Sequence, residues 1–265
     1  MITVSIDPVI VSIGHFMIRW YSLIVVLAVS AGKWLAWREA KRKGLSESVF
    51  SDVVIWAIIG GLIGARLFHV MDHWSDEYAA APMRVLYIWE GGLAIWGAVL
   101  GGLAALALFA WRRGLSLALL VDVVVPGAIL GQAIGRIACI ITGDAMGKPT
   151  TGPFGFVYTN PNAMVPQLGV YYTPTPVYEI AMNLAIFAVI WRLRSRALPD
   201  GVLFLIYLLL YSAGRFLVTF SSAYQITAFG LNQAQIISLA AFLAGLPLLI
   251  HLLRRDQALP SVFKR

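Results

Sequence analysis

The chain has 265 residues, of which 60% are hydrophobic and 12% charged, and its formal net charge is +7. About half of the residues of an ordinary soluble domain are apolar, so this composition excludes that class and indicates an integral membrane protein. The basic residues cluster between apolar segments, so we interpret them as signals of membrane orientation and expect no nucleic-acid partner. A single cysteine, Cys139, excludes an intramolecular disulfide and any multi-cysteine metal site.

The first fifteen residues alternate between apolar and polar and are too short to cross a bilayer of about 30 Å. We expect residues 1–15 to form an interfacial arm along the membrane surface. They lack a basic region ahead of their apolar stretch, so we expect no cleavable signal peptide.

Seven apolar segments follow, and each is long enough for a transmembrane helix. The predicted spans cover residues 16–37, 49–71, 87–111, 115–141, 174–192, 201–220 and 232–253. Residues 142–174 are rich in Gly, Pro, Thr, Asn and Tyr without a helical period, and predict a long structured outer loop. The sequence therefore predicts an all-α integral membrane protein, with a seven-helix domain over residues 16–255 and a tail over residues 256–265.

The basic residues orient these spans. Of the 20 Lys and Arg residues, 13 lie after the first, third, fifth and seventh predicted spans or in the tail. Because cytoplasmic segments carry an excess of Lys and Arg, we expect the N-terminus outside and the C-terminus in the cytoplasm.

Three arginines within the apolar segments require an explanation, because a charge within the hydrocarbon costs about 2.5–3.5 kcal/mol. Arg66, Arg136 and Arg215 all lie near the outer ends of spans that run outward. The same depth is predicted for Tyr21, Glu90 and Glu179. A guanidinium offers a phosphate a bidentate fork of donors, and helix N-termini pointing outward favour an anion. We therefore expect these residues to bind the headgroup of an outer-leaflet phospholipid.

Several of these residues could have a structural role instead of binding a phospholipid. Arg66 could pair with Glu90 or Glu179 and hold helices together, and Asp144 could be a simple turn residue between its glycines. Cys139 lies among apolar residues, which raise the pKa of a thiol, so it is better interpreted as a small buried residue than as a nucleophile.

The motifs that carry these residues form an ordered set. Residues 135–147 read Gly-Arg-Ile-Ala-Cys-Ile-Ile-Thr-Gly-Asp-Ala-Met-Gly. The others are Ile-Arg-Trp-Tyr at 18–21, Gly-Ala-Arg-Leu at 64–67, Trp-Glu-Gly-Gly at 89–92, Pro-Thr-Pro-Val-Tyr-Glu at 174–179 and Tyr-Ser-Ala-Gly-Arg-Phe at 211–216. Together they resemble the prolipoprotein diacylglyceryl transferases, integral membrane enzymes that lipidate bacterial lipoprotein precursors.

This resemblance implies a transfer of the diacylglyceryl group from phosphatidylglycerol to the lipobox cysteine thiol in the signal peptide of a prolipoprotein. The reaction forms a thioether, releases glycerol phosphate and needs neither metal nor cofactor. It implies a multi-pass protein of the bacterial cytoplasmic (inner) membrane whose active site faces the outer leaflet. The residues expected to be catalytic are Arg136, Arg215, Asp144 and Tyr21. The residues expected to bind substrate are Arg136, Arg215, Arg66, Tyr211, Glu90, Trp96 and Glu179.

The chain departs from the family pattern at the residue that would activate the thiol. Many members have a histidine, proposed as the base, at the position of Trp96. The signature glutamate is replaced by Asp144, and its two asparagines by Cys139 and Thr142. The remaining candidates are Asp144, Glu90, or no dedicated base, with the arginines supplying most of the rate enhancement.

Two rival functions use the same features. A transporter of anionic lipid or small anions also needs intramembrane arginines, but it should place charge along a path through the membrane. The inner halves of the predicted spans carry little charge beyond Asp122 and Lys33. A non-catalytic binder of anionic phospholipid is the third interpretation, and it would bind the lipid without consuming it.

Overall fold

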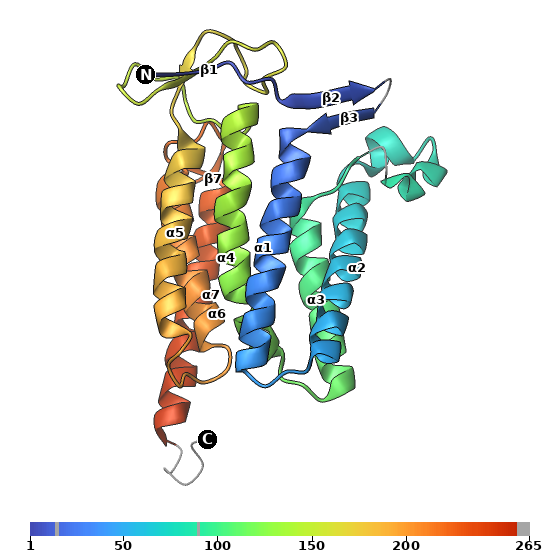
Figure 1. Ribbon diagram of the computed structural model, residues 1–265, viewed down its shortest axis with the longest axis vertical. Helices are drawn as coiled ribbons and strands as arrows, with labels where there is room; N and C mark the ends of the chain where they lie inside the picture. Colours follow the sequence, from blue (N-terminus) through green and yellow to red (C-terminus); the bar gives the residue numbers. More distant parts are fainter. Residues whose placement is uncertain (14–15, 89–90, 259–265) are drawn as a thin grey trace. The chain divides into compact units, whose positions relative to one another are not determined.

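A computed structural model describes residues 1–13, 16–88 and 91–258 of the chain. Its α-helices are α1 (Trp20–Arg42), α2 (Glu47–Asp72), α3 (Ile95–Arg113), α4 (Leu117–Thr142), α5 (Thr175–Leu193), α6 (Val202–Val218) and α7 (Gln233–Ala258) (Figure 1). All except α6 are long and apolar enough to cross a membrane, six in total, while α6 is apolar but has only 17 residues. The predominantly helical fold of a membrane protein is thus confirmed.

The chain forms two compact units whose boundaries fall within α1 and α4. One unit contains residues 1–36 together with the chain from residue 124 onward, and the other contains residues 37–123. The larger unit contains α5, α6 and α7 with most of α1 and α4, and the smaller unit contains α2 and α3.

An apolar cluster joins α4, α5 and α6 in the larger unit. Its buried members are Val125 and Ile129 from α4, Ile186 and Ile190 from α5, and Leu203 from α6. Close backbone contact joins α1 to α4, because a Cβ on Gly32 would lie only 3.0 Å from the carbonyl oxygen of Gly127. Small residues allow helices to approach in this way where lipid offers no hydrophobic driving force between them.

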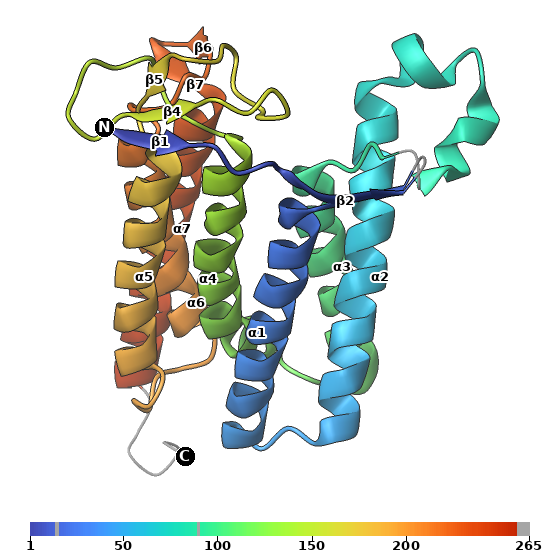
Figure 2. The same ribbon diagram turned by 45° about the horizontal axis from the view of Figure 1, so that its top comes forward.

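Short strands lie beyond one end of these helices (Figure 2). β1 (Ile2–Val4) pairs in parallel with β4 (Phe156–Tyr158), which pairs with the antiparallel strand β5 (Tyr171–Tyr172). The sheet packs on an apolar cluster that includes Val4, Met146 and Tyr158. The hydroxyl of Tyr158 donates a 2.6 Å hydrogen bond to the carbonyl oxygen of Ile140, which ties the sheet to α4. The N-terminal segment is therefore a structural partner of the loop predicted over residues 142–174.

Two further hairpins complete the strands of the larger unit. β2 (Val9–Ile13) pairs with β3 (Phe16–Arg19), and β6 (Ile226–Ala228) pairs with β7 (Leu231–Asn232). The prediction that the first span begins at residue 16 is wrong, because residues 16–19 form β3 and α1 begins at Trp20. Extended backbone therefore extends to residue 19, beyond the predicted end of the arm.

The smaller unit is built on close contact between α2 and α3. A Cβ on Gly64 would collide with the carbonyl oxygen of Gly97, and one on Gly101 would collide with that of Gly60, so only glycine permits this approach. The segment between the two helices contains a π-helical turn, η1 (Trp74–Tyr78), and a 3-10 turn, η2 (Pro82–Leu86).

The third span begins later than predicted. The expected start was residue 87, whereas α3 begins at Ile95. Gly91 and Gly92 have φ angles of +92° and +72°, in the left-handed region that a right-handed helix cannot contain. The Trp-Glu-Gly-Gly motif therefore precedes the helix, and Trp96 is the second residue of α3.

Candidate functional site

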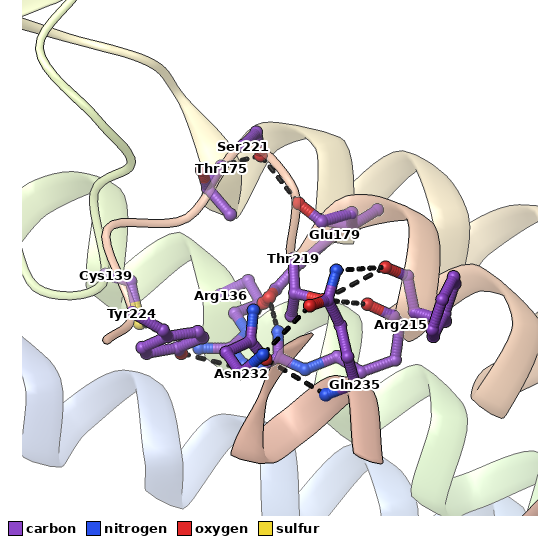
Figure 3. A network of polar contacts seen from close by, with 12 residues as sticks. Arg136, Cys139, Thr175, Glu179, Arg215, Thr219, Ser221, Tyr224, Asn232 and Gln235 are labelled. Atoms are coloured by element: carbon purple, nitrogen blue, oxygen red, sulfur yellow. Dashed lines mark hydrogen bonds and ion pairs between the residues drawn. The ribbon is translucent and has the colours of Figure 1, made fainter. Parts of the chain in front are cut away.

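Two arginines from different helices meet at one buried carboxylate in the larger unit (Figure 3). Glu179, in the second turn of α5, is only 3% exposed. Its Oε2 forms an ion pair with Nε of Arg136 on α4, and its Oε1 forms an ion pair with Nη1 of Arg215 on α6. A buried carboxylate is tolerated only when it is paired, so these three residues, the arginine cluster, depend on one another.

Further contacts orient the two guanidinium groups. Nη2 of Arg215 donates a 3.1 Å hydrogen bond to the hydroxyl of Tyr224, whose ring centroid lies 5.7 Å from Cζ of the arginine. Nη1 of Arg136 lies 3.7 Å from Sγ of Cys139, one turn along α4. Cys139 is buried, in agreement with its interpretation as a small residue packed inside the protein.

The chain after α6 is held in place by polar side chains. The hydroxyl of Thr219 donates to the carbonyl oxygens of Arg215, at 2.9 Å, and Phe216, at 3.0 Å. Asn232 and Gln235 exchange side-chain and backbone hydrogen bonds of 3.0 and 2.9 Å at the start of α7. These contacts fix the end of the helix that carries Arg215 (Figure 3).

Gly147, the last residue of the signature, brings the loop after α4 against the loop after α6. Its backbone N–H donates to the carbonyl oxygen of Thr173 at 2.9 Å, and a Cβ there would collide with the carbonyl oxygen of Ser221. Ser221 also shares a 3.0 Å hydrogen bond with the hydroxyl of Thr175 at the start of α5. The requirement for glycine at this position follows directly from that close approach.

Tyr21 and Asp144 line a common pocket of about 200 Å³ in the same unit. The pocket is also lined by Pro8, Arg19, Ser22, Thr142 and Met164. The backbone N–H of Asp144 donates to the hydroxyl of Thr142 at 3.4 Å, in the turn where Gly143 has a φ of +79°. Tyr21 lies within electrostatic range of both Asp144 and Arg136. Tyr21 therefore connects the pocket electrostatically with Arg136 of the arginine cluster.

Arg66 occupies a different environment, in the smaller unit. It is 7% exposed, and its guanidinium donates to the carbonyl oxygens of Arg84, Val85, Tyr87, Gly91 and Gly92 at 2.5 to 3.4 Å. Cζ of Arg66 also lies 5.3 Å from the ring centroid of Tyr78. This arginine holds the segment between α2 and α3 in place.

The other predicted site residues divide between the two units. Tyr211 lies on α6 four residues before Arg215, and its ring stacks on that of Tyr207 with centroids 5.8 Å apart. Trp96 belongs to the smaller unit and is 43% exposed. Glu90 lies outside the described residues. Among the residues that the structure describes, no group of three His, Cys, Asp or Glu side chains is placed to hold a metal ion.

Sequence reasoning did not single out Tyr224 or Arg19 as site residues. Tyr224 lies in a short segment after α6 without a motif of its own, and only its proximity to Arg215 in the chain could have indicated it. Arg19 stands directly before the Trp-Tyr pair of the motif at residues 18–21, which was a usable signal.

Comparison with known proteins gives a consistent result. A family model described as prolipoprotein diacylglyceryl transferase matches residues 8–251. A relative from Trichormus variabilis is 38% identical, covering 97% of this chain and 94% of its own. Relatives from Gloeobacter violaceus (38% identical; 91% of each chain) and Dehalococcoides mccartyi (35% identical; 97% of this chain and 98% of the relative) are similar over comparable lengths. All three are named phosphatidylglycerol--prolipoprotein diacylglyceryl transferase.

Proposed function

The chain belongs to the prolipoprotein diacylglyceryl transferase family, and from this premise we propose that its arginine cluster holds the phosphate of phosphatidylglycerol while the lipid is consumed. The protein is a multi-pass bacterial membrane protein and a transferase. Its proposed acceptor is the lipobox cysteine in the signal peptide of a prolipoprotein.

The charge of the arginine cluster carries this proposal. Two guanidinium groups and one carboxylate sum to one positive charge, which matches the single negative charge of a phosphodiester. Glu179 orients both arginines before the lipid arrives, and each guanidinium retains donors for phosphate oxygens. Preorganised donors of this kind stabilise charge that develops on a leaving group.

The proposed reaction is a displacement at the glycerol carbon that bears the phosphate. The sulfur of the acceptor forms a bond to that carbon, and the carbon–oxygen bond to the phosphate breaks with its electron pair on the oxygen. Glycerol phosphate leaves and the diacylglyceryl group remains on sulfur as a thioether. The thiol must lose its proton, because the thiolate is the nucleophile.

Asp144 is the base that we favour for this proton. It lines the pocket that also contains Tyr21, a residue within electrostatic range of Arg136, and no other carboxylate lines that pocket among the described residues. Tyr21 and Tyr211 are proposed to contact the lipid. Arg66 is proposed to contribute to substrate binding by holding the segment that leads to Glu90. Trp96 is proposed to contribute to it by offering an apolar surface to the substrate.

We further propose that α6 completes a set of seven spans, with the N-terminus outside and the site at the outer leaflet. The basic residues in the last turns of α1, α3 and α5 support this orientation, because cytoplasmic segments carry an excess of Lys and Arg. Residues 1–15 and the strand β3 are then an outer arm, the helices from α1 onward form the membrane domain up to residue 255, and residues 256–265 are a cytoplasmic tail.

A transfer assay with purified protein, labelled phosphatidylglycerol and a synthetic lipobox peptide tests the proposal. Label should appear on the cysteine peptide and not on its serine counterpart, with glycerol phosphate released. Arg136→Ala and Arg215→Ala should each abolish transfer, and Arg136→Lys should lose most of it because a point charge cannot replace a bidentate fork. Arg113→Ala, at a surface ion pair with Asp52, is the matched control. Near-normal transfer by either alanine variant of the cluster would contradict the proposed role.

A further inference from the structure

A second set of polar side chains lies deeper along the helices that carry the arginine cluster. Gln132 precedes Arg136 by four residues on α4, and Asn183 follows Glu179 by four residues on α5. Tyr207 lies eight residues, about two turns, before Arg215 on α6. Residues four apart share a helix face, so Gln132 and Asn183 continue the face of the cluster toward the middle of their helices. We call these two residues, with the Tyr207 hydroxyl that is hydrogen-bonded to Gln132, the amide layer.

The amide layer separates the arginine cluster from an apolar core. Nε2 of Gln132 donates a 2.9 Å hydrogen bond to the hydroxyl of Tyr207, which links α4 to α6. Ile129 lies three residues before Gln132 on α4, and Ile186 lies three residues after Asn183 on α5, in both cases farther from the arginine cluster. Both isoleucines belong to the buried apolar cluster against which Tyr207 packs. Polar side chains at this depth are costly, so they call for a role.

Two oxygen atoms of the layer have no hydrogen-bond partner among the described residues. They are Oε1 of Gln132 and Oδ1 of Asn183, and Asn183 is only 2% exposed. Buried polar groups are otherwise nearly always hydrogen-bonded, so such atoms indicate a missing partner. Both atoms are acceptors as placed, but an amide can be turned over so that its NH₂ group takes the place of the unpaired oxygen. In Gln132 the Tyr207 hydroxyl then donates to Oε1, and in Asn183 the NH₂ group occupies the position of Oδ1. The layer can therefore present hydrogen-bond donors to a ligand.

Resting on the function proposed above, we infer that the amide layer binds an ester carbonyl of the donor lipid. One helical turn rises about 5.4 Å, so Gln132 and Asn183 lie about that far along their helices from Arg136 and Glu179. In a phospholipid only the glycerol unit separates the phosphate from the ester groups, which lie on the acyl-chain side. A phosphate held by Arg136 and Arg215 thus places the ester carbonyls near the amide groups of Gln132 and Asn183.

This assignment gives the site a second point of recognition. The arginine cluster recognises any monoanionic phosphodiester, whereas the amide layer recognises acyl esters. Together they select a diacyl lipid over a phosphodiester that lacks ester groups. Binding at two points also fixes the glycerol carbon between them, where the thiolate must attack.

Diester phosphatidylglycerol and its diether analogue, which lacks both carbonyls, provide the test. The wild-type protein should transfer from the diester about threefold to tenfold more efficiently in kcat/KM, as expected for one hydrogen bond. Gln132→Leu and Asn183→Leu should lower the diester rate to the diether rate and leave the diether rate unchanged. Ser238→Ala, which removes a buried hydroxyl from α7, should keep the wild-type preference.

Each other result has a defined meaning. Equal wild-type values of kcat/KM on the two lipids would overturn the assignment. So would leucine variants that lose the same fraction of kcat/KM on both lipids, because that result would show that the amide layer has a structural role and is filled by water. In both cases the protein still transfers lipid, so the proposed function survives. A wild-type protein that transfers from neither lipid would overturn the proposed function and this assignment with it.

Discussion

The hydroxyl of Tyr224 accepts a 3.1 Å hydrogen bond from Nη2 of Arg215, the guanidinium whose Nη1 is ion-paired with Glu179. Tyr224 therefore restricts the orientation of an arginine that we place on the lipid phosphate. Because the two contacts use different nitrogens, Arg215 keeps its ion pair when the hydroxyl is removed.

Tyr224→Phe should reduce kcat/KM by about tenfold. This loss is at the low end of the range expected for a hydrogen bond to a charged group, because the Tyr224 side chain is partly exposed to solvent. The loss should be much smaller than that of Arg215→Ala. The transfer assay with phosphatidylglycerol measures both, and Tyr178→Phe, which alters an exposed tyrosine on α5, is the control. Unchanged kinetics in Tyr224→Phe would show that Glu179 alone orients Arg215.

Glu179→Gln should lower the free energy of unfolding by about 3 kcal/mol, at the low end for a broken buried ion pair, because it leaves two partly buried guanidinium groups without their carboxylate. Inorganic phosphate should raise the Tm of this variant more than that of the wild type, because an added anion replaces the missing charge. Glu39→Gln, which removes another buried carboxylate paired with an arginine, should also destabilise the protein but without the phosphate response. An equal phosphate response in both variants would contradict the role assigned to Glu179.

Arg66→Lys should loosen the segment between α2 and α3. A lysine ammonium has three donors and no planar fork, so it cannot serve the five carbonyl oxygens that Arg66 reaches. We expect a loss of about 2 kcal/mol in unfolding free energy and faster cleavage of residues 79–88 in limited proteolysis. Arg112→Lys, at the far end of α3, is the control, and an unchanged cleavage rate in Arg66→Lys would refute the role assigned to Arg66.

Tyr158→Phe should cost about 1 kcal/mol of unfolding free energy, because it removes the hydrogen bond to Ile140. Burial raises the pKa of Tyr158 above its ordinary value of about 10. The unfolded chain therefore loses this proton before the folded one does, so the contribution is complete below about pH 10 and declines as the pH rises further. Thermal unfolding between pH 8 and pH 11 should show a steeper decline for the wild type than for Tyr158→Phe; parallel curves would refute the buried hydrogen bond.

The helices, and the position of Arg136 and Arg215 near one end of their spans, could be predicted from sequence because both depend on local signals. Long apolar runs indicate the spans, and an arginine within such a run is unusual. The same signal grouped Arg66 with these two, whereas Arg66 donates to backbone carbonyl oxygens between α2 and α3. The pairing of Glu179 with both other arginines joins three helices and has no local signal.

The pairing of β1 with β4 joins residues more than 150 positions apart through strands of three residues, which leave no periodic signal. The late start of α3 depends on the left-handed backbone at Gly91 and Gly92, a conformation that a Gly-Gly pair permits but does not require.

Glu179 also has a consequence for turnover. The proposed substrate brings one negative charge to a cluster with one net positive charge, so the complex is neutral. The released glycerol phosphate is a phosphomonoester that carries about −1.5 to −2 charges near pH 7. After the bond breaks, the anion exceeds the charge of the cluster and faces the buried carboxylate of Glu179, which repels it. Departure of the product then leaves Glu179 as the internal anion between its two arginines, and the site returns to its resting state without outside help.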